Sequence, residues 1–432
     1  MREARMILPA ALCILGLMTL PVFGQNMPAQ AAVKGVEARI QIQGSMNSIV
    51  ELKDGRGLML SSNFKFYDSR DGGYTWRTAG PVMTPEFRKF EGMEGEGSSL
   101  IRLKSGALAL TFPRYNYQGG YALFLVKSYD EGKTWIEETR ISPANINPIS
   151  MSFFFQGCYY GTLIQTQSGR LIQPFRFGIS GSHPEWKKDK AYGKINGQQV
   201  GVEGHYHVPE QDIAFFYFSD DEGKTWRKSR AFVFGWLNEG LDGMTSCDEP
   251  CVAETRDGRI LMFARSQVGR IVKSESKDQG ESWSMVRSAE LASSFSPSRL
   301  VRIPKTGDLL CVWNQVSADE IRKGYRRGRL SAAISTDEGK TWKNFKTLEV
   351  SDGLDKSPTY KAKLSEAKPV RALDDVGNLA AGYATFSYPN VGFLGDNVLV
   401  TYPTSNWTLS EKPTQISSSV LRVIPLAWFY QN

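Results

Sequence analysis

Cysteine is scarce in this chain, with five residues among 432, and one of these, Cys13, lies in an apolar segment near the start. The other four are Cys158, Cys247, Cys251 and Cys311. Small domains that depend on disulfides carry far more cysteine, so a disulfide scaffold is excluded. Cys247 and Cys251 could form one short bridge or remain buried thiols. With 41% hydrophobic and 22% charged residues, the composition also excludes disorder and a coiled coil.

A strong charge of one sign is also missing. The chain has 52 Lys and Arg against 45 Asp and Glu, a formal net charge of +7, and no block of like charges. This pattern gives no indication of a nucleic-acid groove. An anionic partner would have to be recognised by a few well-placed arginines.

Long apolar runs are absent beyond the first residues, so no membrane-spanning helix is predicted. Near the start, Arg2 and Arg5 precede the apolar stretch Ile7–Leu20, and small residues follow up to Gly24. This arrangement is typical of a cleaved signal peptide. We predict a signal peptide over residues 1–24, a short leader over 25–36, and a secreted or periplasmic protein.

Glycine and aromatic residues are abundant, and they recur in a repeat. The pattern Ser-x-Asp-x-Gly-x-(Thr/Ser)-Trp occurs five times, and we call each copy an Asp turn. The aspartate can accept hydrogen bonds from its own turn, the glycine can adopt positive φ, and the tryptophan can pack on a neighbouring unit. We therefore assign these aspartates to structure. They are Asp71, Asp130, Asp221, Asp278 and Asp337, spaced by 59, 91, 57 and 59 residues.

A second repeat, an apolar hairpin around a glycine, is found six times. The turns lie at Gly55, Gly106, Gly169, Gly258, Gly307 and Gly395. Units of four strands repeated six times predict an all-β, six-bladed β-propeller over residues 37–432, with a long insertion in blade 3. The strand expected over Val420–Tyr430 can close the ring with Ala38–Ile42.

Equivalent positions in the blades indicate where a site would form. The second strand of three neighbouring hairpins ends in an arginine, while the next ends in Asn314. Guanidinium groups bind carboxylates in a bidentate manner, so these arginines could surround one anion site, although strand-end arginines can also simply face solvent. The three arginines are Arg114, Arg176 and Arg265.

Glu249 and Tyr388 occupy comparable slots at the start of the first strand in blades 4 and 6. A carboxylate beside a phenol can remove its proton and make it a nucleophile. This pair is therefore a candidate catalytic dyad.

The five Asp turns, the segment Glu249–Gln267 and the segment Arg327–Trp342 resemble the sialidase (neuraminidase) superfamily over nearly all of the predicted mature chain. In that family an arginine triad holds the carboxylate of sialic acid, a tyrosine activated by a glutamate attacks the anomeric carbon, and a separate aspartate is the acid/base. A carboxylate nucleophile would be repelled by the carboxylate of the substrate.

The resemblance implies roles for four residues. Glu249 is similar to the activating glutamate, Arg265 and Arg327 to two triad arginines, and Tyr388 to the nucleophile. The arginine of the family's first blade has no counterpart in Gly44–Ile49. Arg114 or Arg176 could replace it, and Asp68 is the nearest candidate for the acid/base.

The chain has three histidines, and all of them fall between Arg176 and the third Asp turn: His183, His205 and His207. We expect this segment to overhang the central channel of the propeller. His205 and His207 could contact substrate, supply a general base or bind a metal, or they could belong to a polar surface loop. We predict no metal and no cofactor.

These features together predict an exported, sialidase-like glycoside hydrolase that releases a terminal, anionic sugar from a glycan. Two alternatives remain. One is a glycosidase or lyase on another polysaccharide that uses the insertion histidines. The other is a propeller that binds glycans or a protein without catalysis.

Overall fold

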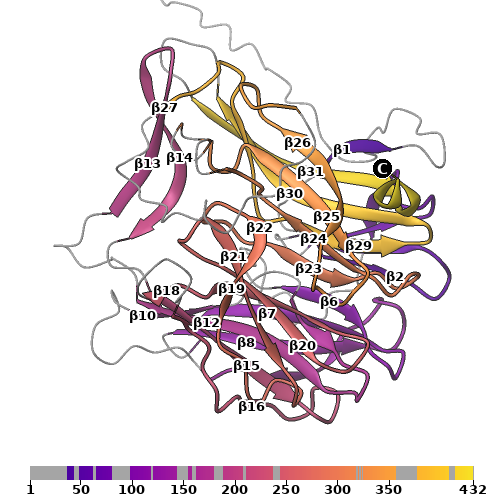
Figure 1. Cartoon of the computed structure of the whole chain (residues 1–432). Helices are drawn as coiled ribbons and strands as arrows, with labels where there is room; N and C mark the ends of the chain where they lie inside the picture. The colour runs from indigo at the N-terminus through magenta and orange to yellow at the C-terminus, as the bar shows by residue number, and fades with distance from the viewer. Residues whose placement is uncertain are drawn as a thin grey trace, which may run out of the picture.

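The structure is a computed structural model of the whole chain (Figure 1). It describes residues 37–42, 48–61, 65–79, 98–117, 120–143, 154–157, 162–179, 188–207, 211–236, 244–317, 320, 323, 325–356, 377–407 and 414–431. The predicted signal peptide over 1–24 and the leader over 25–36 lie outside these residues, as does His183. No helix in the described ranges is long and apolar enough to cross a membrane.

The described chain is almost entirely antiparallel β-sheet, and six sheets of four or five strands follow one another along it. The first holds β2 (Ser48–Glu51), β3 (Gly57–Leu60), β4 (Phe66–Ser69) and β5 (Arg77–Ala79). The second holds β6 (Ser99–Arg102), β7 (Leu108–Tyr117), β8 (Gly120–Ser128) and β9 (Ile136–Arg140). The third holds β10 (Phe154–Gly157), β11 (Ile164–Gln165), β12 (Leu171–Ile179), β15 (Gln211–Ser219) and β16 (Arg227–Lys228).

The second half of the chain forms the other three sheets. The fourth holds β19 (Asp248–Glu254), β20 (Ile260–Arg265), β21 (Arg270–Ser276) and β22 (Arg287–Ala292). The fifth holds β23 (Arg299–Arg302), β24 (Leu309–Trp313), β25 (Arg329–Ser335) and β26 (Lys343–Val350). The sixth holds β28 (Ala384–Phe386), β29 (Asn390–Leu394), β30 (Asn397–Trp407), β31 (Gln415–Pro425) and the early strand β1 (Ala38–Ile42).

The two ends of the described chain meet in the sixth sheet, where β1 pairs antiparallel with β31, as the sequence predicts. The strand expected over Val420–Tyr430 ends earlier, at Pro425, and Leu426–Tyr430 form a 3₁₀ helix. This helix packs on β25 and β26 of the fifth sheet, so apolar residues expected in a strand cover a neighbouring sheet instead.

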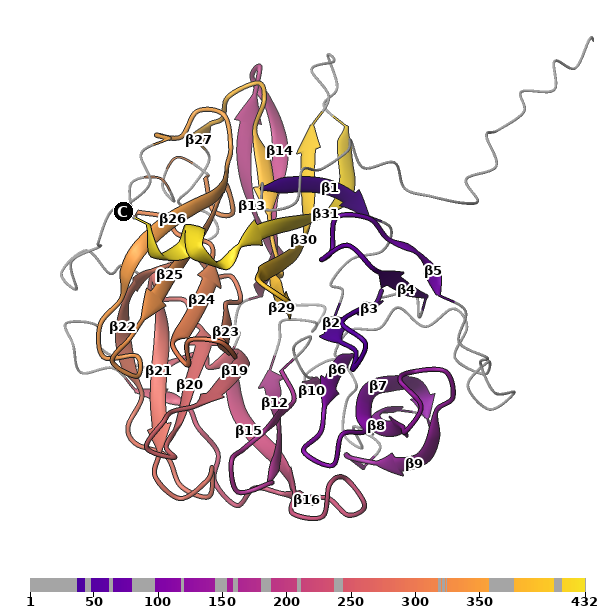
Figure 2. The ribbon, with the colours of Figure 1, turned by 90° about the vertical axis from the view of Figure 1, so that its right-hand side faces the viewer.

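Sheets that follow one another along the chain lie side by side and pack against each other (Figure 2). Each consecutive pair of sheets shares one buried apolar cluster. A further cluster joins the sixth sheet to the first through side chains such as Leu399 and Met59. Single strands of neighbouring sheets also touch, since β2 contacts β6 and β29, and β19 contacts β12 and β23. The core is therefore distributed between the sheets.

The five Asp turns form the hydrogen-bonded structure that their sequence predicts. In the first, Asp71 Oδ1 accepts from the Thr75 amide at 2.9 Å and the Ser69 hydroxyl at 2.9 Å, while the Ser69 hydroxyl accepts from the Gly73 amide. Gly73 has φ +99°, a conformation that favours glycine. The other four turns repeat these bonds around Asp130, Asp221, Asp278 and Asp337. These aspartates are thus structural.

The tryptophan that ends each Asp turn packs on the preceding sheet. Trp135 stacks on Phe66 of the first sheet with ring centroids 5.8 Å apart, and Trp283 stacks on Phe216 of the third at 4.6 Å. Trp342 lies 5.7 Å from Phe263 of the fourth. The tryptophan of each repeat therefore helps to hold the preceding sheet in place.

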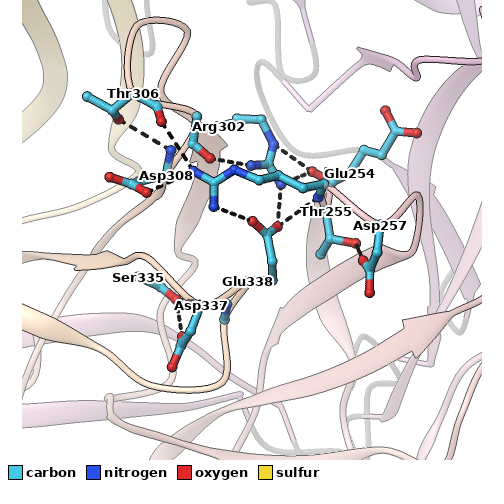
Figure 3. Close-up of polar contacts among 12 residues, drawn as sticks. Glu254, Thr255, Asp257, Arg302, Thr306, Asp308, Ser335, Asp337 and Glu338 are labelled. Atoms are coloured by element: carbon cyan, nitrogen blue, oxygen red, sulfur yellow. Dashed lines mark hydrogen bonds and ion pairs between the residues drawn. The ribbon is translucent and has the colours of Figure 1, made fainter.

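A glutamate inside three of the Asp turns provides a second link between sheets, which the sequence analysis missed. Glu338 accepts from the Arg256 amide at 2.9 Å, in the hairpin turn of the fourth sheet, and from Arg302 Nη2 at 2.6 Å in its own sheet (Figure 3). Glu131 and Glu222 make equivalent contacts. All three have φ between +53° and +64°, a strained conformation that persists only where contacts hold it.

A separate small sheet stands beside the six. Its strands are β13 (Lys188–Ile195), β14 (Gln198–His207) and β27 (Gly377–Asn378), and β27 pairs parallel to β13. The segment expected as an overhanging loop thus contains a hairpin. Ile195 and Val200 anchor it in a buried cluster with Phe295, Tyr383 and other side chains.

We predict that Glu338→Ala lowers the free energy of unfolding by about 0.5–1.5 kcal/mol, because the exposed Arg256 amide and the guanidinium groups of Arg256 and Arg302 lose their acceptor. Alanine keeps the same unfavourable φ, so the substitution isolates the side-chain contacts. Chemical denaturation monitored by tryptophan fluorescence measures the change. Glu290→Ala, at an exposed position of β22, is the matched control, and equal stabilities for the two variants would contradict the role of Glu338.

Candidate functional site

Four predicted site residues converge from three sheets, the third, fourth and sixth. Arg176 is on β12, Glu249 is at the start of β19, Arg265 ends β20, and Tyr388 lies between β28 and β29. They lie at the end of the sheets away from the Asp turns. β12 and β20 run away from their glycine hairpin turns, whereas β19 and β29 run toward theirs and have Glu249 and Tyr388 at or just before their starts. The fold therefore brings together residues that lie up to 212 positions apart, from 176 to 388.

The centre of the site is a hydrogen bond from the Tyr388 hydroxyl to Glu249 Oε1, 3.0 Å long. The other oxygen, Oε2, accepts from Arg265 Nη1 at 2.9 Å. Both Glu249 and Tyr388 have positive φ, +43° and +48°. A β-bulge between Asp248 and Cys251 re-aims the Glu249 side chain. Such strain in two facing non-glycine residues is typical of functional sites.

The surroundings of Glu249 keep it ionised. Burial alone would raise the pKa of this carboxyl, but Arg265, Arg176 and Arg327 outweigh burial and lower it. Glu249 is 8% exposed, so its charge acts in a medium of low dielectric constant. It is therefore an anionic acceptor poised to take the phenolic proton of Tyr388.

Arg327 completes this side of the site from the segment just before β25. Its Cζ lies 5.4 Å from the Tyr388 ring centroid, and its Nη2 donates to the Phe295 carbonyl at 3.4 Å. The Phe295 ring in turn lies 3.7 Å from the Arg265 Cζ. One aromatic residue thus positions both guanidinium groups, and the sequence analysis did not identify it.

Arg176 is held by two buried aspartates. Its Nη1 lies 3.1 Å from Asp212 Oδ1 and 3.0 Å from Asp248 Oδ1, and both carboxyl groups are at most 1% exposed. Ser246 donates to Asp212 at 3.3 Å. Arg265 Nε lies 3.6 Å from Asp248 Oδ2, which joins this group to the Glu249 pair.

Two carboxyl groups on one guanidinium cannot both ionise easily in a buried site. Burial, with Asp212 and Glu249 nearby, raises the pKa of Asp248 to about 7 despite Arg176. Burial also raises the pKa of Asp212. Burial alone would lower the pKa of Arg176, but the negative charges of Asp248 and Asp212 outweigh burial and raise it. With one proton on the aspartates, three arginines face two carboxylates, and the site carries a net positive charge.

The other predicted site residues either have partners outside this site or have side chains that the structure does not describe. Arg114 stacks on Phe124 at 4.3 Å and pairs with Glu138, both on strands of its own sheet, so we leave it out of the candidate site. His205 and His207 lie on β14, and their side chains fall outside the described residues. Within the described part of the chain, no group of three or more His, Cys, Asp or Glu is arranged to hold a metal.

Asp68, the candidate acid/base, has a structural environment. It is buried on β4 and pairs with Arg77 at 2.6 Å and Arg56 at 3.2 Å. The hydrogen bond from Arg77 and the bond from Arg56 lower its pKa, against the effect of burial. A carboxyl held ionised in this way is a poor proton donor, so Asp68 does not fit the acid role.

The cysteines beside Glu249 are free thiols. Cys247 and Cys251 are fully buried, and the structure does not join them in a bridge. Burial raises the pKa of both. They pack in the clusters on either side of the fourth sheet and fix the strand that carries Glu249.

The family model of the BNR repeat-like domain matches residues 67–400, more than half of the chain. This protein belongs to the BNR repeat-like family. The predicted BNR-type repeat is confirmed at the level of this family, and solved sialidases share its fold. No curated protein matches the BNR protein in sequence.

Three solved structures illustrate the fold. A protein of unknown function from Dyadobacter fermentans is 15% identical with a TM-score of 0.51, over 91% of this chain and 100% of that one. The Trypanosoma rangeli sialidase is 14% identical with a TM-score of 0.51, over 91% of this chain and 56% of that one. The NanB sialidase of Streptococcus pneumoniae, as a K499G mutant, is 13% identical with a TM-score of 0.50, over 90% and 70%. The BNR protein thus spans about half the length of the Trypanosoma enzyme.

We predict that Asp248 makes the stability of the BNR protein pH-dependent. The pKa of Asp248 is raised from an ordinary 3.8 to about 7, so between these values the native state binds more protons than the unfolded chain, and the free energy of unfolding falls as pH rises. Asp248→Asn resembles the protonated form and removes this contribution. Denaturation curves from pH 4 to 8 should show that the stability of the wild type, relative to the variant, decreases toward pH 7.

The control for this experiment is Asp396→Asn, which removes a carboxylate whose side chain is 88% exposed. Relative to the wild type, its effect should stay constant across the same range. A constant difference for Asp248→Asn as well would show that Asp248 is ionised throughout.

Proposed function

We propose that this protein is an exported, sialidase-like exo-glycosidase that releases a terminal anionic sugar from a glycan. The observation that carries the proposal is the hydrogen bond between Tyr388 and Glu249, with Arg265 on the second carboxylate oxygen and Arg327 against the phenol ring. Two of the proteins with the same fold are sialidases, which supports the same class of substrate.

We further propose that the six sheets are the blades of a six-bladed propeller, with the β13–β14 hairpin as an insertion in blade 3. The buried cluster between the sixth and first sheets supports a closed ring. Export rests on the basic start, the apolar stretch and the small residues over 1–24, which the sequence carries.

In the proposed reaction, Glu249 takes the proton of the Tyr388 hydroxyl as the phenolic oxygen attacks the anomeric carbon. The bond from that carbon to the leaving-group oxygen breaks, the electron pair departs with this oxygen, and the oxygen takes a proton from solvent. Water then attacks the anomeric carbon and gives one proton to solvent, while the Tyr388 oxygen leaves as phenolate and regains a proton from Glu249.

A phenol suits this site better than a second carboxylate would. The substrate brings its own negative charge, and a neutral nucleophile approaches it without repulsion until the proton is removed. The cost of forming a phenolate is offset by the adjacent guanidinium of Arg327, 5.4 Å from the ring.

We propose that Arg176, Arg265 and Arg327 bind the acid group of the sugar. With one proton on the aspartates that hold Arg176, the site has one positive charge in excess, which a substrate carboxylate would neutralise. Arg176 has a side chain that is 19% exposed, compared with 2% for Arg265, so it is the more accessible of the two. It would thus take the place of the arginine that the first blade lacks.

We predict that Tyr388→Phe and Glu249→Gln each lower kcat on an aryl α-sialoside by about 100-fold or more, since each removes the nucleophile or its general base. Release of the aryl alcohol measures the rate. The matched control is Tyr129→Phe, which removes a phenol bonded to Glu137 at 3.0 Å on the outside of the second sheet. It should retain full activity.

Other results would favour the alternatives. Unchanged turnover in both site variants would contradict the proposed mechanism, and loss of activity only in His207→Ala would favour chemistry by the insertion histidines. Binding of glycans without hydrolysis of any would favour a binding propeller.

We also predict that Arg327→Lys raises KM for an acidic sugar by about 10- to 100-fold, because a lysine cannot make the planar, bidentate contact. The experiment compares the sialoside with a neutral analogue in which the carboxylate is replaced by a carboxamide. The variant should lose discrimination between the two substrates. If Arg327→Lys affects both equally, Arg327 does not bind the acid group.

A further inference from the structure

Three exposed aromatic side chains alternate along residues 232–236, a segment that follows β16 of the third sheet and ends in the short strand β17. Phe232, Phe234 and Trp236 are 46%, 51% and 52% exposed. The residues between them point inward, since Val233 is 4% exposed and bonds to Ala214 through the backbone, and Gly235 is buried. Alternate residues of an extended strand share a face, so the three rings line one side, about 7 Å apart. We call them the aromatic row.

The clustering of these rings is unusual for this surface. Seven large apolar side chains of the described chain are exposed, and three of them make up the row. The others are dispersed over the second, fourth and sixth sheets: Tyr129, Ile136, Met285 and Ile416. Isolated exposed apolar residues are ordinary, whereas a contiguous set indicates a binding surface.

The row leads toward the candidate site. Its last member lies on β17 (Gly235–Trp236), which pairs with β18 (Met244–Thr245), and Trp236 is opposite Met244. From Met244 the chain runs directly to Glu249, five residues on, a span of about 17 Å at most. Both β18 and β19 contact β15 of the third sheet. The near end of the row is therefore tied to the strand that carries the proposed base.

Cations border the far end of the row. Lys228 Nζ lies 4.4 Å from the Phe232 ring centroid and 4.7 Å from that of Phe215, and Arg230 is exposed. Rings with neighbouring donors suit a ligand that has apolar faces and polar edges. A pyranose ring is such a ligand, since its C–H face stacks on an aromatic plane and its hydroxyls point outward.

We propose that the aromatic row binds the carbohydrate chain whose terminal sugar occupies the arginine site. The inference rests on the proposed function. A row one strand wide offers too little area for a stable protein partner, which needs roughly 800 Å² on each side. Single-stranded nucleic acid also stacks on aromatic residues, but the sequence has no block of basic residues that would hold its backbone. The row would favour long glycans over single sugars.

The test measures binding in Tyr388→Phe, which removes the nucleophile and keeps the site otherwise intact. Calorimetry gives Kd for sialic acid, for a sialylated oligosaccharide of four or more sugars, and for the same oligosaccharide without its sialic acid. The oligosaccharide should bind at least tenfold more tightly than the monosaccharide. Adding Phe232→Ala, Phe234→Ala and Trp236→Ala should abolish this gain and leave Kd for the monosaccharide unchanged.

Met285→Ala with Ile416→Ala is the matched control, since it removes exposed apolar side chains from other sheets and should preserve the gain. Thermal unfolding checks that all variants fold. A gain that survives in the triple variant, or a triple variant that loses only binding to oligo-dT, would overturn the proposal. If sialic acid fails to bind but the asialo-oligosaccharide binds through the row, the row stands and the sialidase proposal fails.

Discussion

The site depends on one carboxylate that serves two partners. One oxygen of Glu249 accepts a hydrogen bond from the Tyr388 hydroxyl, and the other accepts one from the guanidinium of Arg265, which is always charged. Arg265, together with Arg176 and Arg327, keeps the carboxylate ionised inside a buried site, and ionisation is what allows it to accept the phenolic proton. Without these guanidinium groups, burial would favour the neutral acid, and the Tyr388 hydroxyl would face a group that no longer acts as a base.

The six-sheet architecture makes this arrangement possible. The donor, the acceptor and the cations come from four neighbouring sheets, the third to the sixth. Each sheet is held to the next by a buried cluster and by the tryptophans of the Asp turns. The Asp turns and their glutamates lie at one end of the strands, while the strained backbone of Glu249 and Tyr388 lies at the other. Regular, satisfied hydrogen bonds at one end thus support a strained site at the other end.

Much of this could be predicted from the sequence, because repeats are local. An Asp turn contains its own acceptor, its glycine and its tryptophan within eight residues, so each copy specifies its structure. The positions of Glu249, Arg265, Arg327 and Tyr388 followed from their matching places in the repeats and from the resemblance to sialidases. The structure brings all four together, while their roles in chemistry remain a proposal.

The contacts between sheets were harder to predict from the sequence. Asp212 carries no sequence signal that pairs it with Arg176 or Asp248, since the two aspartates lie on different sheets and meet only through the fold. Asp248 directly precedes Glu249, which could have drawn attention to it. Arg114 shares the strand-end position of Arg176, yet its side chain turns to Glu138, because the pattern fixes the position of a residue but not its rotamer. The hairpin of the insertion was missed because its strands have no repeat to compare with.

The most direct test of the account is to trap the glycosyl–enzyme intermediate. A fluorinated sialosyl fluoride slows hydrolysis of the intermediate, so the wild-type protein should accumulate a covalent adduct that peptide mass spectrometry locates on Tyr388. A labelled peptide that lacks Tyr388, or continued turnover of a sialoside with no adduct at all, would contradict the central claim that a phenol activated by Glu249 attacks the sugar.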